Sequence, residues 1–505
     1  MTPSAHTLPL DLDRHTAGSR SSRPAGSLPG DAMPVRSRGR TTRVLRGARL
    51  VALVAAMALA GCASMAPDYQ RPAAPVEATF PGAERATAVE SAAAAADISW
   101  HAFFSDPRLK HLIGIALENN RDLRATGLAI EQARAQYGIQ RADEWPTINA
   151  IASGVRQPGP TGTMTSIYTV GLGITAFEFD FFGRIRSLSD AALAQYLGTE
   201  QAHRTAQMSL IAAVASTYLN LVASDELLDV TRQTLGTREQ SLKLTKLMFD
   251  NGAASELDYR QAESLVQGAR VTLAQVTRRR ALDENALVLL LGQPMPKDLP
   301  AQQAILKQGL LPDLPVGLPS DVLTRRPDIL QAEQQLIAAN ANIGAARAAF
   351  YPRISLTTSA GVASTELSEL FNNGRFAWTL SPQALLPIFD RGRNKANLKA
   401  TEAARDIAVA QYEQAIQSAF REVADALATR QTLVDEVRAQ RAQVSAEAAR
   451  LRLADLRYRS GAASYLDVLD AQRSLFVAQQ AVVQVQTAQV QNLVTLYKVL
   501  GGGWK

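Results

Sequence analysis

The chain contains an internal duplication, which constrains its fold more than any other feature. The seven residues that start at Gly252 return 209 positions later, starting at Gly461, with six of the seven identical. Nearer the N-terminus an offset of 206 aligns Asp122 with Asp328, so a three-residue length change lies between these markers. Two copies are too few for a solenoid array. Each copy is therefore predicted to be half of a domain, with a mixed structure of its own.

The pattern of apolar residues predicts the same order of elements in each copy: a helix, two strands, a very long helix, a tight turn and a second long helix. We place the first structural repeat at residues 106–300, the second at residues 320–505, and an inter-repeat linker at 301–319. Residues 62–105 precede the repeats. Their Pro-rich and Ala-rich sequence is typical of an extended tether.

The first 61 residues are typical of a signal peptide. Six arginines between positions 36 and 49 precede the apolar run at 50–59, which is shorter than the roughly 20 residues needed to span a bilayer. Met33 is an alternative start, because residues 1–32 exceed what a signal peptide needs. The run leads into Leu59-Ala60-Gly61-Cys62, which resembles the bacterial lipoprotein box. The alternative for Cys62 is a buried thiol; as the only cysteine, it cannot form an intrachain disulfide.

The net charge of +6 belongs to the leader rather than to the rest of the chain. Residues 1–61 hold nine basic and three acidic residues, and subtracting these from 53 and 47 leaves 44 of each in residues 62–505. The mature chain is therefore formally neutral. It lacks the basic surface that nucleic-acid binding requires, so we expect no nucleic-acid partner.

Strands are predicted at residues 147–157 and 165–180 in the first copy, and at 352–364 and 375–389 in the second, because apolar and polar residues alternate there. Two sets of alternating residues should each share a face: Tyr168, Val170, Leu172, Ile174 and Ala176, and Phe376, Trp378 and Leu380. Strands of this length with terminal aromatics fit a membrane barrel wall, although a water-soluble sandwich is equally compatible. Four strands cannot close a membrane barrel, and open edges in lipid leave backbone groups unpaired. If the strands are in a membrane, the chain must oligomerise.

Long helices are predicted over residues 184–249 and 394–458, each roughly 100 Å long. Shorter helices are expected at residues 106–144 and 320–350, each ending before a proline. Such long helices need lateral neighbours, from this chain or from other chains.

The duplicated segment has the signals of a helical hairpin, with turns at residues 251–255 and 460–464. Gly252 and Gly461 fit a left-handed helix terminator. Ser255 with Asp258, and Ser464 with Asp467, match the capping-box pattern that starts a new helix. Capping explains these residues fully. It explains the small residues between them less well, namely Ala253, Ala254, Ala462 and Ala463.

Asp470 lies one turn after Asp467 on the same helix face, whereas its counterpart in the first copy is Gln261. Repeated around a symmetry axis, the two carboxylates would form an anionic ring of the kind that constricts pores. The alternative is a solvated helix face near an N-terminus, which the helix dipole favours. Spacing alone leaves both interpretations open.

Several motifs in order resemble the outer-membrane factor family, especially the OprM-like and NodT-like lipoproteins of resistance-nodulation-division (RND) efflux pumps, which are relatives of TolC. Besides the lipoprotein box and the two turns, they are Pro67-Asp68-Tyr69, Asn119-Asn120-Arg121-Asp122-Leu123, Arg325-Arg326-Pro327-Asp328-Ile329 and Leu500-Gly501-Gly502-Gly503-Trp504. The resemblance covers essentially all of the mature chain. It implies a mainly α protein with a membrane β-barrel portion: a homotrimer whose twelve-stranded β-barrel, four strands per chain, crosses the outer membrane and continues as an α-helical periplasmic tunnel.

The resemblance also implies a function: a passive exit duct of a tripartite efflux system, which exports small toxic molecules and is gated at its periplasmic tip. The implied partners are a periplasmic membrane-fusion adaptor, an inner-membrane RND pump and outer-membrane lipid. Cys62 would carry a diacylglycerol and an N-acyl chain, and no other cofactor is expected. The alternatives are a type I protein secretion or metal-efflux component, and a structural coiled-coil lipoprotein without a pore.

The resemblance assigns roles at the tip. The adaptor would dock on both turns: Gly252, Ala253, Ala254, Ser255, Gly461, Ala462, Ala463 and Ser464. Asp470 would form the closed gate, with Asp467 as a weaker candidate. Asp258 and Tyr458 stand where two tethering residues would be. In TolC an arginine at the position of Ala463 completes this tether, so a salt-bridge latch of that form is doubtful in this chain.

An enzyme has little support in the sequence. The mature histidines are His101, His111 and His203, and their spacing does not match a metal site. Neither a phosphate-binding loop nor a nucleophile elbow is found. We therefore expect neither catalysis nor a metal site.

Overall fold

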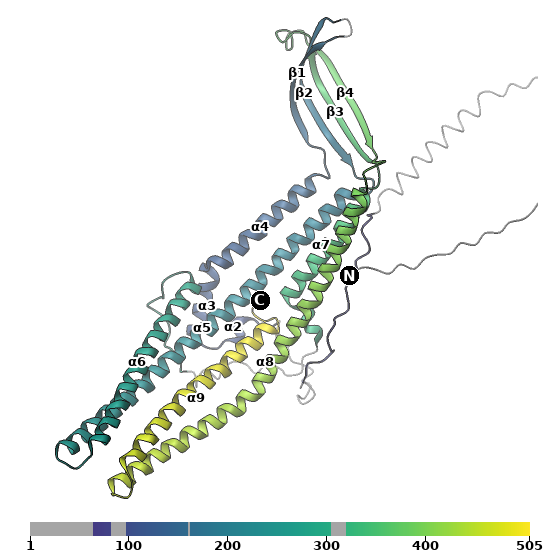
Figure 1. Ribbon diagram of the computed structural model, residues 1–505. Coiled ribbons are helices and arrows are strands. Elements are labelled where there is room, and N and C mark those ends of the chain that lie inside the picture. The colour runs from purple at the N-terminus through teal and green to yellow at the C-terminus, as the bar shows by residue number, and fades with distance from the viewer. Residues whose placement is uncertain (1–63, 82–96, 160–161, 305–319, 505) are drawn as a thin grey trace, which may run out of the picture. The chain divides into compact units, whose positions relative to one another are not determined.

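The computed structural model describes residues 64–81, 97–159, 162–304 and 320–504 (Figure 1). The predicted signal peptide, Cys62 and most of the inter-repeat linker lie outside the described residues. Statements below concern the described part of the chain.

The two repeats have the same order of elements, which confirms the duplicated fold predicted from the sequence. A short helix, α2 (Trp100–Phe103), precedes them. The first repeat contains α3 (Pro107–Asn119), α4 (Arg121–Ala142), β1 (Ile148–Pro158), β2 (Met164–Phe179), α5 (Arg184–Asp250) and α6 (Glu256–Leu291). The second contains η4 (Ser320–Arg325), α7 (Pro327–Ala348), β3 (Arg353–Ser364), β4 (Arg375–Leu385), α8 (Arg393–Arg459) and α9 (Tyr465–Val499). The four strands lie at one end of the long helices and the two turns at the other (Figure 1).

The first helix of each repeat is broken, and the prediction of one continuous helix was wrong in both. Asn120 adopts an extended conformation between α3 and α4, and its side chain accepts a hydrogen bond from the amide of Leu123 (2.9 Å), which caps α4. Arg326 is extended in the same place before Pro327. A capping asparagine and a proline at the first helical position both favour a new helix start. The breaks therefore occupy duplicated positions.

The strands form one antiparallel sheet in the order β1-β2-β3-β4. Its register places Ala150, Leu172, Ala360 and Trp378 in one row across all four strands. The rows on either side of it hold Ala152, Val170, Val362 and Phe376, and Ile148, Ile174, Thr358 and Leu380. One face of the sheet is thus apolar from edge to edge.

Two details of the strands differ from the prediction. The β2–β3 register shifts between Ile174 and Phe177, and Ala176 has a positive φ of 53°. This bulge removes Ala176 from the apolar face and puts Phe177 in its place, because one extra residue reverses the alternation. The second difference is that β4 ends at Leu385 rather than at residue 389. Pro387 follows closely and has no amide hydrogen to donate to a ladder.

The helices share one large hydrophobic core, in which α2, α3, α5, α6, α7, α8 and α9 all take part. Tyr218 and Tyr497 are among its fully buried side chains. One stretch of α5 is apolar enough to cross a membrane by composition, with a mean hydropathy of 1.4, but 56% of it is buried in the protein. We interpret this stretch as a core helix, which passes the same test as a membrane span.

The predicted tether is extended and is held against α7. Tyr69 and Arg71 both donate to the carboxylate of the buried Glu333, the guanidinium through two bonds of 2.7 Å. Asn340 donates to the backbone carbonyl oxygen of Pro67 (2.7 Å). A Cβ at Gly344 would lie 2.7 Å from the Ala66 nitrogen, so glycine allows this close approach.

Candidate functional site

The first turn closes α5 against α6 with the geometry its sequence predicts. Gly252 has a φ of 74°, and the amides of Gly252 and Ala253 donate to the carbonyl oxygens of Phe249 (2.9 Å) and Met248 (2.7 Å). This is a Schellman motif, in which glycine avoids the steric cost of a left-handed residue. Ser255 and Asp258 then form a complete capping box at the start of α6.

The second turn repeats the first half of this arrangement and not the second. Gly461 also has a φ of 74°, and Ala462 donates to the carbonyl oxygen of Arg457 (2.8 Å). Ser464, however, makes no side-chain capping bond, so the predicted second capping box was wrong. The amide of Asp467 donates to the backbone carbonyl oxygen of Ser464 (3.2 Å) instead of its hydroxyl.

The two copies of the motif differ at one position, Glu256 against Tyr465, and this residue joins the hairpins. Glu256 is exposed, whereas Tyr465 is buried. The Tyr465 hydroxyl lies 2.7 Å from the Ser241 hydroxyl on α5, and its ring packs against Tyr458 at a centroid distance of 5.1 Å. Tyr465 thus attaches the second turn to the first hairpin.

Asp470 is not an isolated carboxylate. It forms an ion pair with Arg450 on α8, across its own hairpin, and Arg450 also contacts Glu447 (3.2 Å) and the Ser474 hydroxyl (3.2 Å). These acids raise the pKa of Arg450, which therefore stays charged. Asp467 is exposed. Of the two predicted gate residues, the structure places one in a charge network and the other in solvent.

Asp258 and Tyr458, the two residues predicted to tether the tip, lie close together but share no hydrogen bond among the contacts described. The Tyr458 hydroxyl lies 3.7 Å from Sδ of Met248, and Asp258 is engaged in its capping box. Burial raises the pKa of the Tyr458 hydroxyl, and Tyr465 and Asp258 add to this effect. The turn residues themselves are largely exposed, with Ala254 and Ala463 partly buried. The turns therefore present small side chains at the tip.

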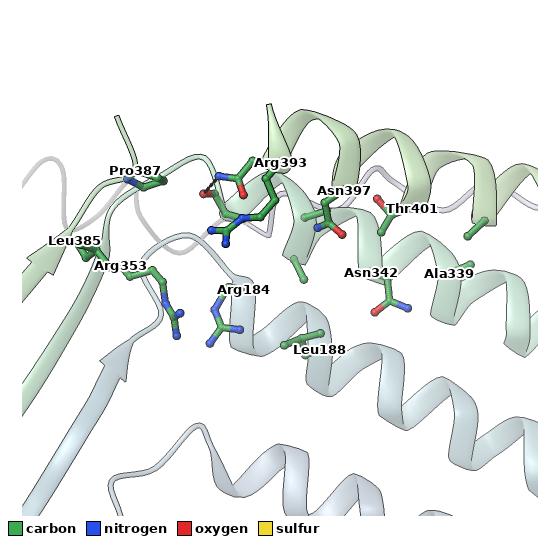
Figure 2. Close-up of a pocket in the computed structure, with 15 residues that line it drawn as sticks. Arg184, Leu188, Ala339, Asn342, Arg353, Leu385, Pro387, Arg393, Asn397 and Thr401 are labelled. Atoms are coloured by element: carbon green, nitrogen blue, oxygen red, sulfur yellow. Dashed lines mark hydrogen bonds between the residues drawn. The ribbon is translucent and has the colours of Figure 1, made fainter. Parts of the chain in front are cut away.

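A second polar region lies where the sheet meets the helices. Figure 2 shows Arg184, Arg353 and Arg393 around a cavity of about 530 Å³, with Asn342 and Asn397 on its helical side. Glu178 binds the first two arginines, at 2.8 Å to Arg184 and 2.6 Å to Arg353. Asp180 and Asp143 also act on Arg184, and Asp390 acts on Arg393, so several acids offset the charge of the arginines at this cavity.

The sequence did not identify several residues of these sites. Arg450 stands 11 residues before Gly461 and Asp470 nine residues after it, so counting outward from the turn would have paired them. Tyr465 could have been identified from the sequence, because it is the one difference between two otherwise identical seven-residue segments. Glu333 carried no such signal, since Arg71 lies 262 residues away. Glu178 pairs with Arg353, 175 residues away, and also with Arg184, six residues after it, so only the second of these pairings was within local reach.

Comparison with known proteins decides the family. The sequence model described as "Outer membrane efflux protein" matches residues 112–293 and again residues 318–502, once in each repeat. The chain belongs to the outer membrane efflux protein family.

Relatives of this efflux protein agree in sequence and in structure. The probable efflux pump outer membrane protein TtgC of Pseudomonas putida is 48% identical over 459 residues, which cover 89% of this chain and 94% of TtgC. The outer membrane protein OprJ of Pseudomonas aeruginosa is 48% identical over 465 residues, covering 90% and 95%. The open state of the MtrE outer membrane channel of Neisseria gonorrhoeae matches with a TM-score of 0.81 and 42% identity, over 88% of this chain and 99% of that one.

The efflux protein is thus an outer-membrane component of an efflux system, as its sequence predicted. Within its described residues, His, Cys, Asp and Glu do not form any group of three or more that would hold a metal ion. The chemistry available at the tip is ion pairing, capping and hydrogen bonding.

Proposed function

We propose that this protein is a passive, gated exit duct that works as a homotrimer. The observation that carries the proposal is the apolar face, which crosses all four strands while the outer edges of β1 and β4 stay unpaired within the described chain. Exposed apolar residues such as Trp378 (67% exposed) and Phe376 (73% exposed) need lipid or protein contact.

The need to pair the two outer edges of the sheet determines how the chains assemble. Backbone groups at a sheet edge in lipid must be paired, and a membrane barrel has no edges. Joining β4 of one chain to β1 of the next pairs both edges, and three chains give the twelve strands implied by the family resemblance. The opposite face carries Ser153, Gly171, Ser359 and Thr379 in three successive rows. It is mostly small and polar, apart from Ile151, Val155 and Ile167 toward the β1 edge, and suits a water-filled interior.

The tip is proposed to be both gate and docking site. Asp470 and Asp467 lie just beyond the second turn, where three copies around an axis would bring six carboxylates together. The exposed turns at Gly252–Ser255 and Gly461–Ser464 offer small residues on which a periplasmic adaptor can dock.

The cargo and partners follow from the relatives. Relatives are named as antibiotic, toluene and solvent efflux proteins, and small toxic compounds are therefore the proposed cargo. An inner-membrane RND pump and a membrane-fusion adaptor are the proposed partners, in preference to a protein secretion or metal-efflux system. A lipid on Cys62 is the proposed anchor, and catalysis forms no part of the proposal.

Conductance of the purified protein in planar bilayers tests the channel. The wild type is expected to conduct weakly, and Asp470→Ala combined with Asp467→Ala is expected to conduct more, since neutral side chains remove the proposed gate. Absence of conductance in both proteins would remove the basis of the channel and favour a structural coiled-coil lipoprotein.

Export in cells tests the docking site. Glutamate, a bulky charged side chain, in place of Ala254 or Ala463 is expected to abolish export of toxic compounds while trimers still reach the outer membrane. The matched control is glutamate at Ala274, an exposed alanine on α6 that lies outside both turns, and it should leave export unchanged. Normal export by both test variants would contradict docking at the turns.

A further inference from the structure

A buried cation lies between the two hairpins. The Arg238 residue on α5 is only 5% exposed. Its Nη1 donates to the backbone carbonyl oxygen of Leu265 on α6 (3.0 Å), and its guanidinium lies over the Phe476 ring on α9 (5.0 Å). Its Nε has no hydrogen-bond partner among the described residues. A guanidinium has five N–H donors, so these contacts leave it poorly satisfied.

The surroundings of Arg238 disfavour the charged form of its side chain. Burial lowers the pKa of this guanidinium, and the nearby Arg473 lowers it further. Within the described part of the chain, Arg238 has no ion pair with any carboxylate. Buried charges in proteins are normally paired, and an unpaired one is strongly destabilising.

A cavity gives access to this cation. It has a volume of about 160 Å³ and is lined by Arg238, Gln472 and Phe476, among others. The Gln472 side-chain oxygen is also buried without a partner in the described structure. Thr237, Leu451 and Gln472 line both this cavity and a larger one of about 530 Å³ that continues between α5 and α8 to Tyr458 and Tyr465 near the second turn. The cation thus lines the smaller of two adjoining cavities, which together form a groove between the hairpins.

Comparison of the two repeats shows that the first hairpin lacks the acidic residues of the second. The offset of 209 aligns Arg238 with Glu447, and Gln261 with Asp470. In the second hairpin these two acids neutralise Arg450. In the first hairpin both acids are absent and a cation occupies one of their positions. The same offset aligns Arg450 with Ser241, so the first hairpin lacks this network, and the buried Arg238 has no counterpart of Glu447 or Asp470 with which to pair.

We propose that Arg238 and Gln472 form a binding site for a carboxylate group. A guanidinium can hold a carboxylate through two parallel hydrogen bonds, and the free Nε belongs to the edge that makes them. The Gln472 amide can turn its NH₂ group toward the same ligand. The carboxylate comes from a small organic anion or from an acidic side chain of a partner protein that lies in the groove, and the site accepts both on the same chemistry.

Hydrogen exchange of the purified full-length protein tests the site without reference to export. Sodium acetate serves as the probe, against sodium chloride at equal ionic strength. Amides near Arg238 and Phe476 are expected to exchange about tenfold more slowly when acetate is ten times its dissociation constant. Arg238→Met should lose this protection and still fold, because an apolar side chain of similar length replaces a buried charge. Arg232→Met, at an exposed arginine on the same helix, should keep it.

A second experiment identifies the source of the carboxylate and rests on the proposed export function. Arg238→Glu is expected to impair export while trimers still form. If replacing an acidic residue of a partner protein by lysine restores export by the Arg238→Glu variant, the carboxylate belongs to that partner. If acetate protects the amides and no such change restores export, the carboxylate belongs to a small anion. Equal acetate protection in wild type and Arg238→Met overturns the proposal, as does absence of both protection and restoration. Because the first experiment needs only the purified protein, its failure leaves the channel proposal standing.

Discussion

Single substitutions between the two copies give the tip its asymmetry. Glu256 and Tyr465 occupy the same position in the motif, yet the first faces solvent and the second is buried against α5. Gln261 and Asp470 also occupy equivalent positions, and only the aspartate forms an ion pair with an arginine of its own hairpin. A duplicated backbone thus carries two different sets of contacts, and each set depends on one or two side chains.

The hydroxyl contact between Tyr465 and Ser241 should contribute measurably to the attachment of the second turn. Tyr465→Phe removes the buried hydroxyl and leaves that of Ser241 without its partner, so the free energy of local opening should fall by about 1 kcal/mol. Hydrogen exchange of the first-turn amides of α9 measures this opening. Ser241→Ala should cost a similar amount, and the double variant should cost less than the sum of the two. Full additivity would show that the contact contributes nothing.

Asp390 should make the start of α8 sensitive to acid. Its carboxylate accepts hydrogen bonds from the amides of Asn394 and Gly392, each 2.8 Å long, and these bonds lower its pKa from the ordinary value of 3.8. A lowered pKa gives stability that is present above 3.8 and is lost as the pH falls through the lowered value. Asp390→Asn should therefore melt below the wild type at pH 5–7 by circular dichroism, and the difference should vanish under strong acid. A difference that persists at low pH would exclude this cause.

At the scale of elements, the two turns are a matched pair for testing helix capping. Ser255→Ala removes a complete capping box and should destabilise the start of α6 by about 1 kcal/mol. Ser464→Ala removes no side-chain capping bond and should change the start of α9 little. Hydrogen exchange at both helix starts compares them within one molecule. Equal losses at the two sites would contradict the difference in capping.

Elements with local signals were predictable, and contacts between elements were not. The turns were predicted because Gly252 and Gly461 sit where a left-handed residue must end a helix. The break at Asn120 had a local signal, an asparagine cap, that helical periodicity concealed. The bulge at Ala176 had none, because an alternating pattern continues through it until the partner strand fixes the register. The Glu178–Arg353 ion pair forms only when the two repeats fold together, and the Glu333–Arg71 ion pair only when the segment before the repeats packs against α7.

At the scale of the whole molecule, the described chain leaves two strand edges unpaired. One is on β1 and the other on β4, and the apolar face of the sheet extends to both. One chain offers two different edges, so the contact between chains is head-to-tail and must close into a ring. The helical hairpins, held together through Tyr465, would then alternate around the same axis.

Disulfide trapping tests this ring. Cysteine at Ala152 on β1 should form a disulfide with cysteine at one of Phe376, Trp378 or Leu380 on β4 of a neighbouring chain, because all lie on the apolar face and directly opposite residues approach within bonding reach. Each chain then makes two links, so oxidation should give covalent trimers on a denaturing gel. Cysteine at Ser153, on the opposite face, should not link to the same positions. Linked dimers without trimers would show an interface that does not close, and would require a different account of the four strands.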